Sequence, residues 1–337
     1  MKSTRIVLAS RPTGMPEQEN FRTETVELPP PGPGEALLQT LYLSLDPYMR
    51  GRMSDAPSYA PPVEIDETMY GATVSRVLES EDPALRPGDI VLGYGGWQTH
   101  SVEKTQYLRQ VDPAVAPIST SLGVLGMPGF TAYSGLLTIG RPQPGETVVV
   151  AAATGPVGAT VGQIAKIKGA RAVGIAGGPQ KVALLREKFG FDAAIDHKAH
   201  DFVDQLAAAT PDGIDVYFEN VGGAVLDAVL PRLNKFARIP VCGLISGYNA
   251  TELPPGPDRM GLLMGLILRK SLTLRGFIQT EFLGQFSEFH PDATGWLTDG
   301  RLTYLEDVVD GLDQAVDAFR GLLTGKNLGK LVIKVSD

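Results

Sequence analysis

The sequence predicts an α/β protein in which an open, doubly wound parallel sheet is inserted into a mostly β domain. Short strands divided by proline and glycine come first, strands alternating with helical patterns follow, and strand patterns return near the C-terminus. Alternating strands and helices form parallel sheets with right-handed crossovers, whereas closely spaced short strands form antiparallel domains. We therefore expect a first domain over residues 1–124, a second over 125–293, and a return to the first domain over 294–337.

The first region contains four expected strands, which run over Thr25–Leu28, Glu35–Ser44, Gly71–Leu78 and Asp89–Leu92. The central region contains six, over Thr147–Ala153, Ala172–Ala176, Ala193–Asp196, Asp215–Asn220, Arg238–Cys242 and Leu272–Phe277. The tail adds a strand, a helix and a strand, over Leu305–Val309, Leu312–Leu323 and Leu331–Val335.

A glycine-rich turn joins the first central strand to a helix. The strand ends in Ala153-x-Gly155-x-x-Gly158, and apolar residues then recur at three- and four-residue spacing. Free backbone N–H groups and the helix dipole meet at such a turn, and glycine lets a pyrophosphate approach the backbone. The pattern predicts a dinucleotide site. The alternative is an ordinary βα turn in which glycine supplies only backbone freedom.

The next strand favours the phosphorylated cofactor, NADP(H). NAD enzymes usually place an acidic residue at its end to bind the ribose 2′-hydroxyl. This chain has Gly177-Gly-Pro-Gln-Lys181 there, so no carboxylate repels a 2′-phosphate and Lys181 can pair with one. The alternative is that Lys181 is a solvated residue of the next helix.

Composition excludes several other classes of protein. The 337 residues carry a formal net charge of −8, which disfavours a general nucleic-acid surface. No apolar run is long enough for a membrane span, and the N-terminus does not read as a signal peptide. Cys242 is the only cysteine, which excludes an internal disulfide and fits a cytoplasmic protein. The four histidines show no metal spacing, so we expect no catalytic metal.

Six segments spread along the chain carry recognisable motifs, which are Leu43-Ser-Leu-Asp-Pro-Tyr-Met-Arg-Gly-Arg-Met53, Gly126-Met-Pro-Gly-Phe-Thr-Ala-Tyr133, Ala151-Ala-Ala-Thr-Gly-Pro-Val-Gly158, Tyr217-Phe-Glu-Asn-Val-Gly-Gly223, Val241-Cys-Gly-Leu-Ile-Ser-Gly-Tyr-Asn249 and Gly325-Lys-Asn-Leu-Gly-Lys330. With these motifs, nearly the whole chain resembles the medium-chain dehydrogenase/reductase superfamily, in its zinc-independent branch of prostaglandin, alkenal and bacterial NADPH-dependent curcumin reductases. In zinc-dependent relatives a ligand cysteine stands near Leu43–Asp46.

The resemblance implies a Rossmann domain inserted in a GroES-like domain. It assigns the pyrophosphate to Gly155, Pro156, Val157 and Gly158, and the 2′-phosphate to Lys181, with His197 where the family often has a tyrosine. Further cofactor contacts would come from Asn220, Cys242, Ser246, Tyr248, Phe277, Gln279 and, from the returning tail, Asn327. Cys242 has no feature that lowers its pKa, so a buried small residue is the preferred interpretation over a nucleophile.

The expected reaction is hydride transfer from NADPH to the β-carbon of an α,β-unsaturated ketone or aldehyde. Tyr248 would donate to the carbonyl oxygen, and Tyr48 and Tyr59 would position the carbonyl or supply a proton. The alternatives are a quinone reductase, a reductase run in the reverse direction, and a silent NADPH-binding redox sensor. By analogy with the superfamily we expect a homodimer that pairs the edge strand Leu272–Phe277.

Overall fold

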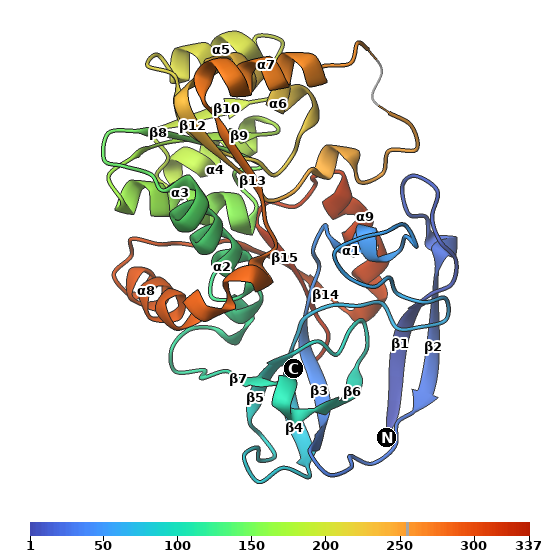
Figure 1. Cartoon of the computed structure of the whole chain (residues 1–337). Helices are drawn as coiled ribbons and strands as arrows, with labels where there is room; N and C mark the ends of the chain where they lie inside the picture. Colours follow the sequence, from blue (N-terminus) through green and yellow to red (C-terminus); the bar gives the residue numbers. More distant parts are fainter. Residues whose placement is uncertain (254–255) are drawn as a thin grey trace. The chain divides into compact units, whose positions relative to one another are not determined.

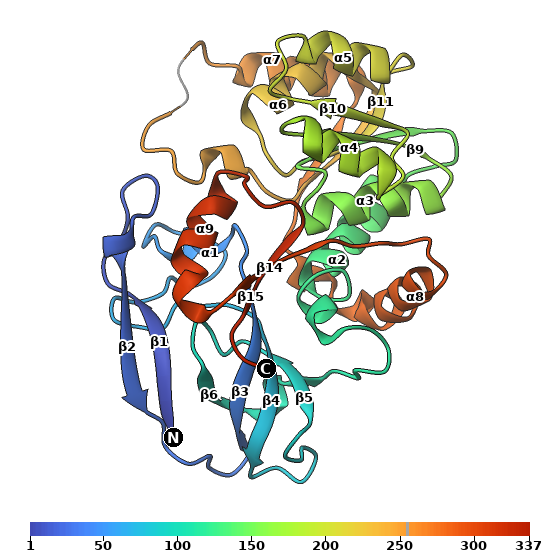
Figure 2. The same ribbon diagram turned by 180° about the vertical axis from the view of Figure 1, so that it is seen from behind.

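The computed structural model describes residues 1–253 and 256–337, which form two compact units (Figures 1 and 2). Unit 1 comprises Met1–Gly123 and Glu306–Asp337, and unit 2 comprises Val124–Leu305. The chain therefore leaves unit 2 later than the expected residue 294. The reason is packing, because the Trp296 ring lies 6.1 Å from that of Tyr133 and the Thr303 N–H donates to Gln163 Oε1 at 2.8 Å.

Unit 1 is built on a seven-stranded sheet in the order β14-β15-β3-β4-β5-β7, with β6 also pairing with β3. The strands are β3 (Glu35–Ser44), β4 (Thr73–Ser80), β5 (Ile90–Gly93), β6 (His100–Lys104), β7 (Arg109–Gln110), β14 (Glu306–Asp310) and β15 (Lys330–Lys334). The helices of this unit are the one-turn α1 (Met49–Arg52) and α9 (Ala315–Leu323). Strands β14 and β15 come from the returning tail, and β15 pairs antiparallel with β3.

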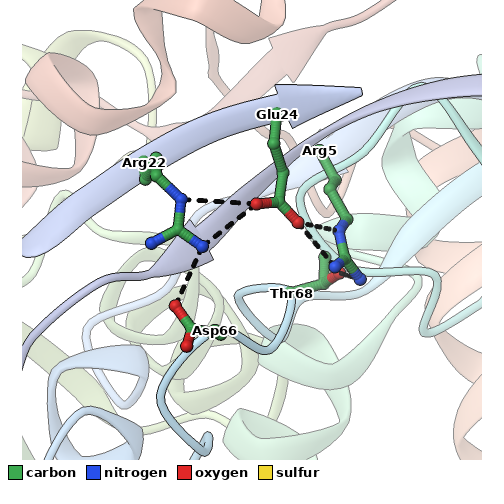
Figure 3. A network of polar contacts seen from close by, with 5 residues as sticks. All are labelled: Arg5, Arg22, Glu24, Asp66 and Thr68. Atoms are coloured by element: carbon green, nitrogen blue, oxygen red, sulfur yellow. Dashed lines mark hydrogen bonds and ion pairs between the residues drawn. The ribbon is translucent and has the colours of Figure 1, made fainter. Parts of the chain in front are cut away.

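A second, two-stranded sheet pairs β1 (Lys2–Leu8) with β2 (Phe21–Glu27). The sequence analysis predicted β2, β3, β4, β5, β14 and β15 of this unit but not β1, β6 or β7. An ionic network joins this hairpin to the segment that contains Asp66 and Thr68 (Figure 3). Glu24 accepts from Arg5 at 2.6 Å and from Arg22 at 3.0 Å, while Arg22 also reaches Asp66 at 2.8 Å and Arg5 reaches Thr68 at 3.4 Å.

Unit 2 holds a six-stranded parallel sheet in the order β10-β9-β8-β11-β12-β13. Its strands are β8 (Thr147–Ala151), β9 (Arg171–Ala176), β10 (Ala193–Asp196), β11 (Ile214–Phe218), β12 (Leu233–Val241) and β13 (Thr273–Gly276). The order reverses between β8 and β11, where a doubly wound sheet places its ligand. The predicted doubly wound sheet is confirmed.

Helices cover both faces of this sheet (Figures 1 and 2). One face carries α2 (Met127–Ser134), α3 (Pro156–Ile167) and α4 (Pro179–Glu187), and the other carries α5 (Phe202–Ala209), α6 (Gly223–Val229) and α7 (Met260–Lys270). Helix α8 (Phe286–Thr298) packs its aromatic residues against α2, with Phe289 5.4 Å from Phe130. All five residues of β8 are buried, as expected for a strand covered on both sides.

Candidate cofactor site and tyrosine cluster

The glycine turn after β8 fits a phosphate group. Gly155 stands at the N-cap of α3 and Pro156 occupies the first helical position, where its fixed φ suits a helix start. A Cβ at Gly158 would lie 2.5 Å from the Ala152 carbonyl oxygen, so only glycine fits there. Ala152 itself has φ +51°, an unusual conformation for alanine that no pattern in the sequence predicts. The N–H groups of Val157 and Gly158, in the first turn of α3, have no acceptor within the helix and suit an anion.

A second glycine turn, after β9, is surrounded by basic side chains. A Cβ at Gly177 would lie 2.8 Å from His197 Nε2 and 3.0 Å from Lys198 Cε, so both side chains lie against this turn. Lys181, in the first turn of α4, is close enough for its charge to act on His197. The turn therefore gathers Lys181, His197 and Lys198. Sequence reasoning missed Lys198, although its position directly after His197 was a usable signal.

Asp196 holds this basic turn in place. Its Oδ1 accepts from the Gly178 N–H at 2.8 Å and from the Lys198 N–H at 2.9 Å. Burial by itself would raise the pKa of Asp196, but these two backbone donors hold that pKa below its usual range. The Asp196 carboxylate therefore binds the backbone of the turn through both of these hydrogen bonds.

The pKa of His197 is lowered, chiefly by burial and then by the charge of Lys198, with Asp196 opposing and Lys181 adding to the effect. An imidazole with a lowered pKa is neutral at neutral pH. A bound anion would favour its protonated form.

The carboxyl ends of β11 and β12 bring together the next group of predicted residues. Asn220 donates from Nδ2 to the Ala151 carbonyl at 2.9 Å, which ties the end of β11 to the end of β8. The Ser246 hydroxyl donates to the Val221 carbonyl at 2.5 Å. The Tyr248 hydroxyl lies against the backbone of Gly243, where a Cβ would be 3.1 Å away. Tyr248 and Ser246 are therefore placed at the sheet edge where open α/β sheets bind ligands.

Cys242 and Phe277 follow the ends of β12 and β13, and the side chains of both are held in packed surroundings. Burial raises the pKa of the Cys242 thiol to about 12, so it is not an activated nucleophile. Phe277 is buried, and its ring packs against Phe218 at 6.1 Å and Phe282 at 5.9 Å. Any contact of Phe277 with a cofactor would therefore come from its backbone. Gln279 follows at the start of the 3-10 turn after β13.

Glu219 is a buried carboxylate in the same region that the sequence analysis did not select. Its Oε1 accepts from the N–H of Val221 at 2.6 Å and of Gly222 at 2.9 Å, and from the Tyr217 hydroxyl at 3.1 Å. Burial raises the pKa of Glu219 despite these donors. Its contacts show that it shapes the turn after β11, next to Asn220.

In unit 1, Tyr48 lies in a cluster of aromatic side chains. The Arg52 guanidinium carbon is 5.7 Å from the centre of the Tyr48 ring and 5.0 Å from that of Tyr59. Burial, followed by the charge of Asp46, raises the pKa of Tyr48 well above its usual value, so its hydroxyl keeps its proton at neutral pH.

Asn327, on the returning tail, donates from its amide to the Gly329 carbonyl at 2.7 Å.

A buried ion pair lies just before Tyr48, in the segment where zinc-dependent relatives carry a ligand cysteine. Lys330 Nζ donates to Asp46 Oδ1 at 2.8 Å and to the Leu45 carbonyl at 2.7 Å, while the Ser44 hydroxyl donates to the other Asp46 oxygen. In the described part of the chain, no three His, Cys, Asp or Glu side chains form a group that could hold a metal ion. Across residues 1–253 and 256–337, no helix is long and apolar enough to cross a membrane.

Comparisons with known proteins match both units. Residues 4–111 match the family model described as the N-terminal domain of oxidoreductase, and residues 156–296 match the zinc-binding dehydrogenase model. The chain is 57% identical over 336 residues to NADPH-dependent curcumin reductase of Escherichia coli (strain K12), covering 99% of this chain and 97% of that protein. It is 43% identical to prostaglandin reductase 1 of Bos taurus over 327 residues, covering 95% of both.

The solved structure of CurA from Vibrio vulnificus in complex with NADPH is also similar, with a TM-score of 0.96, 54% identity and 99% of both chains covered. The match to each of these relatives extends over nearly the whole length of this chain. The chain therefore belongs to the zinc-independent branch of the medium-chain dehydrogenase/reductase superfamily, with the curcumin and prostaglandin reductases.

Proposed function

We propose that the protein is an NADPH-dependent reductase of the carbon–carbon double bond of α,β-unsaturated ketones and aldehydes. The observation that carries the choice of cofactor is the basic glycine turn after β9. His197 and Lys198 lie against Gly177, the charge of Lys181 acts on His197, and the Asp196 carboxylate is taken up by backbone N–H groups. The relatives named as NADPH-dependent reductases support the same cofactor.

The residues present fit this cofactor. The turn from Gly155 to Gly158 offers backbone N–H groups to the pyrophosphate, and the absence of a side chain at Gly158 lets the helix start pack closely on the end of β8. The ends of β11 and β12 carry Asn220, Ser246 and Tyr248 for the remainder, with Gln279 after β13. When bound, NADPH supplies the hydride that adds to the β-carbon of the enone.

Tyr248 is the proposed donor to the substrate. Negative charge develops on the carbonyl oxygen as the double bond is reduced, and a neutral hydroxyl stabilises it with a hydrogen bond. The Tyr248 hydroxyl lies beside Gly243, which has no side chain that could cover this hydroxyl. Tyr48 and Tyr59 of unit 1 are the proposed groups that position the carbonyl or return a proton to the α-carbon.

The test is steady-state NADPH oxidation with a short enone, a long alkenal, a dienone and a quinone, each repeated with NADH. We expect turnover of the enones with a saturated ketone or aldehyde as product. A Tyr248→Phe variant should lower kcat by roughly 10–10³-fold with NADPH binding intact. Turnover of the quinone alone would replace this proposal with a quinone reductase, and an unchanged kcat would remove Tyr248 from the role.

The oligomeric state and the location in the cell complete the proposal. Strand β13 lies at the edge of its sheet, and α7 beside it exposes Met260, Leu262, Met264 and Leu268, so we propose that a second copy pairs along this edge. Light scattering after size exclusion should give twice the mass of the 337-residue chain, and a monomer at micromolar concentration would contradict it. We place the enzyme in the cytoplasm, which suits a chain with one cysteine, and cell fractionation tests that location.

A further inference from the structure

Glu219 is a buried carboxylate of unit 2 that directly follows β11, and it is only 1% exposed. Its Oε1 accepts three hydrogen bonds, from the N–H groups of Val221 and Gly222 and from the Tyr217 hydroxyl. Its Oε2 is buried and has no hydrogen-bond partner among residues 1–253 and 256–337. Hydrogen bonds therefore stabilise a negative charge on one oxygen of this carboxylate and not on the other.

The surroundings of Glu219 supply no counter-ion. The titratable side chains that face it are Tyr217, on β11 itself, and Cys242, directly after β12. Both are neutral at neutral pH, because burial, followed by the charge of Glu219, raises the pKa of each. In the part of the chain that the structure describes, no Lys, Arg or His side chain forms an ion pair with Glu219. Ionised Glu219 is thus a buried charge in need of a cation, and burial raises its pKa for this reason.

The backbone of Glu219 is fixed at the edge of the sheet where the cofactor is proposed to bind. Its N–H donates to the Pro240 carbonyl at 3.0 Å, and its carbonyl accepts from the N–H groups of Cys242 at 2.9 Å and Gly243 at 3.2 Å. These bonds join the ends of the neighbouring strands β11 and β12. Because β11 also borders the switch point beside β8, Glu219 lies directly next to the proposed cofactor contacts, with Asn220 following it in the chain.

The two redox forms of the cofactor differ in charge at one place. The nicotinamide ring is positively charged in NADP⁺ and neutral in NADPH, whereas the phosphate groups are the same in both. A nearby positive charge favours the ionised form of a carboxyl group, and the effect is larger where water is excluded. NADP⁺ would therefore supply the positive charge that the surroundings of Glu219 lack, and NADPH would not.

Resting on the proposed function for its cofactor, we infer that Glu219 is a specificity-determining residue that sets the relative affinity of the protein for NADP⁺ and NADPH. Ionised Glu219 favours NADP⁺, and protonated Glu219 does not. Binding of NADP⁺ then drives the Glu219 proton into solvent, so the affinity for NADP⁺ relative to NADPH rises with pH. Because NADP⁺ is the oxidised product of enone reduction, protonated Glu219 favours the direction of reduction.

The test is the ratio of the Kd of NADP⁺ to the Kd of NADPH, measured by calorimetric titration from about pH 6 to about pH 9. We expect this ratio to fall roughly three- to tenfold over that range in the wild-type protein. Glu219→Gln keeps the shape of the side chain but cannot ionise, so its ratio should stay at the value that the wild type has at low pH. Groups that bind the 2′-phosphate, such as His197, act on both forms of the cofactor alike and cancel in the ratio.

Glu306→Gln is the matched control, because burial also raises the pKa of Glu306 but this residue belongs to unit 1. Its ratio should follow that of the wild type. A wild-type ratio that does not change with pH, or a pH dependence that persists in Glu219→Gln, would overturn the inference.

The wild-type protein alone decides the question if Glu219→Gln does not fold. Titration in two buffers of different ionisation enthalpy counts the protons released on binding, and NADP⁺ should release more of them than NADPH at the same pH. Equal proton release by the two forms would contradict the role of Glu219. These titrations need no enone, so their outcome is separate from the turnover that tests the proposed reductase activity.

Discussion

Replacing Lys330 with methionine should destabilise unit 1 strongly, because Lys330 neutralises a buried carboxylate. The side chains of Lys330 and Asp46 are only 3% and 6% exposed, and the ammonium donates to both Asp46 and the Leu45 carbonyl. Methionine fills similar volume but leaves the charge of Asp46 without its counter-ion. Removing one partner of a buried pair costs about 3–5 kcal/mol, even where the intact pair contributes little compared with an apolar replacement.

The expected loss translates into a large thermal shift. For a unit of this size about 1 kcal/mol lowers Tm by 2–4 °C, so Lys330→Met should lower it by roughly 6–20 °C. Trp97 is fully buried in unit 1 and Trp296 belongs to unit 2, and the chain has two tryptophans. In a Trp296→Phe background, the fluorescence of Trp97 therefore reports the unfolding of unit 1 by heat or urea.

Two further variants make the argument refutable. Lys334→Met, at the end of the same strand as Lys330, removes an exposed pair with Asp337 and should change the unfolding transition little. The double variant Asp46→Asn, Lys330→Met removes both buried charges and should recover at least half of the loss. If Lys330→Met shifts unfolding no more than Lys334→Met, or if the double variant is as unstable as the single, the account of this pair is wrong.

Three predictions concern the cofactor site and are measured by NADPH and NADH titration. Lys181→Ala should lower the affinity for NADPH by about fivefold, which corresponds to the loss of about 1 kcal/mol from a partly exposed ion pair, and should leave the affinity for NADH unchanged. An equal loss of affinity for both cofactors would show that Lys181 does not bind the 2′-phosphate. Because the pKa of free His197 is lowered and a bound 2′-phosphate would raise it, NADPH binding should take up a proton and tighten roughly fivefold from pH 8 to 6.5, and His197→Asn should abolish this dependence. Gly158→Ala should lower the affinity for both cofactors by roughly tenfold or more, since its Cβ would lie 2.5 Å from the Ala152 oxygen. Gly155→Ala, whose Cβ would have its nearest contact at 3.3 Å, should lower these affinities less.

The sequence predicted the parallel sheet well because its signals are local. Strand β10 of this sheet begins and ends where its residue pattern does, at Ala193–Asp196, and β3 of the sheet in unit 1 likewise matches its pattern at Glu35–Ser44. The glycine pattern likewise marks the start of α3 without reference to the rest of the chain. The return of the tail at Glu306 was not local in this sense, because it depends on Trp296 and on the bonds of Gln163, and on where those side chains pack.

The candidate site was predicted where one motif holds its residues, and missed where packing assembles them. Lys181 and His197 were identified separately, but only the fold brings them to the same glycine turn, and it adds Lys198 to them. The Tyr70 ring stacks on Tyr94 at 5.3 Å and meets Tyr48 edge-on at 6.5 Å. Tyr70 and Tyr94 belong to no motif, and nothing in their neighbours along the chain distinguishes them from exposed tyrosines such as Tyr107.

What joins Tyr70 to Tyr94 is a pair of backbone hydrogen bonds between segments about two dozen residues apart, at a point where only glycine fits. Asp66, Thr68 and Gly96 anchor these segments through bonds that involve neither ring. The two rings are therefore brought together by backbone that is fixed by residues far apart in the sequence, which is why no local pattern predicts the pair.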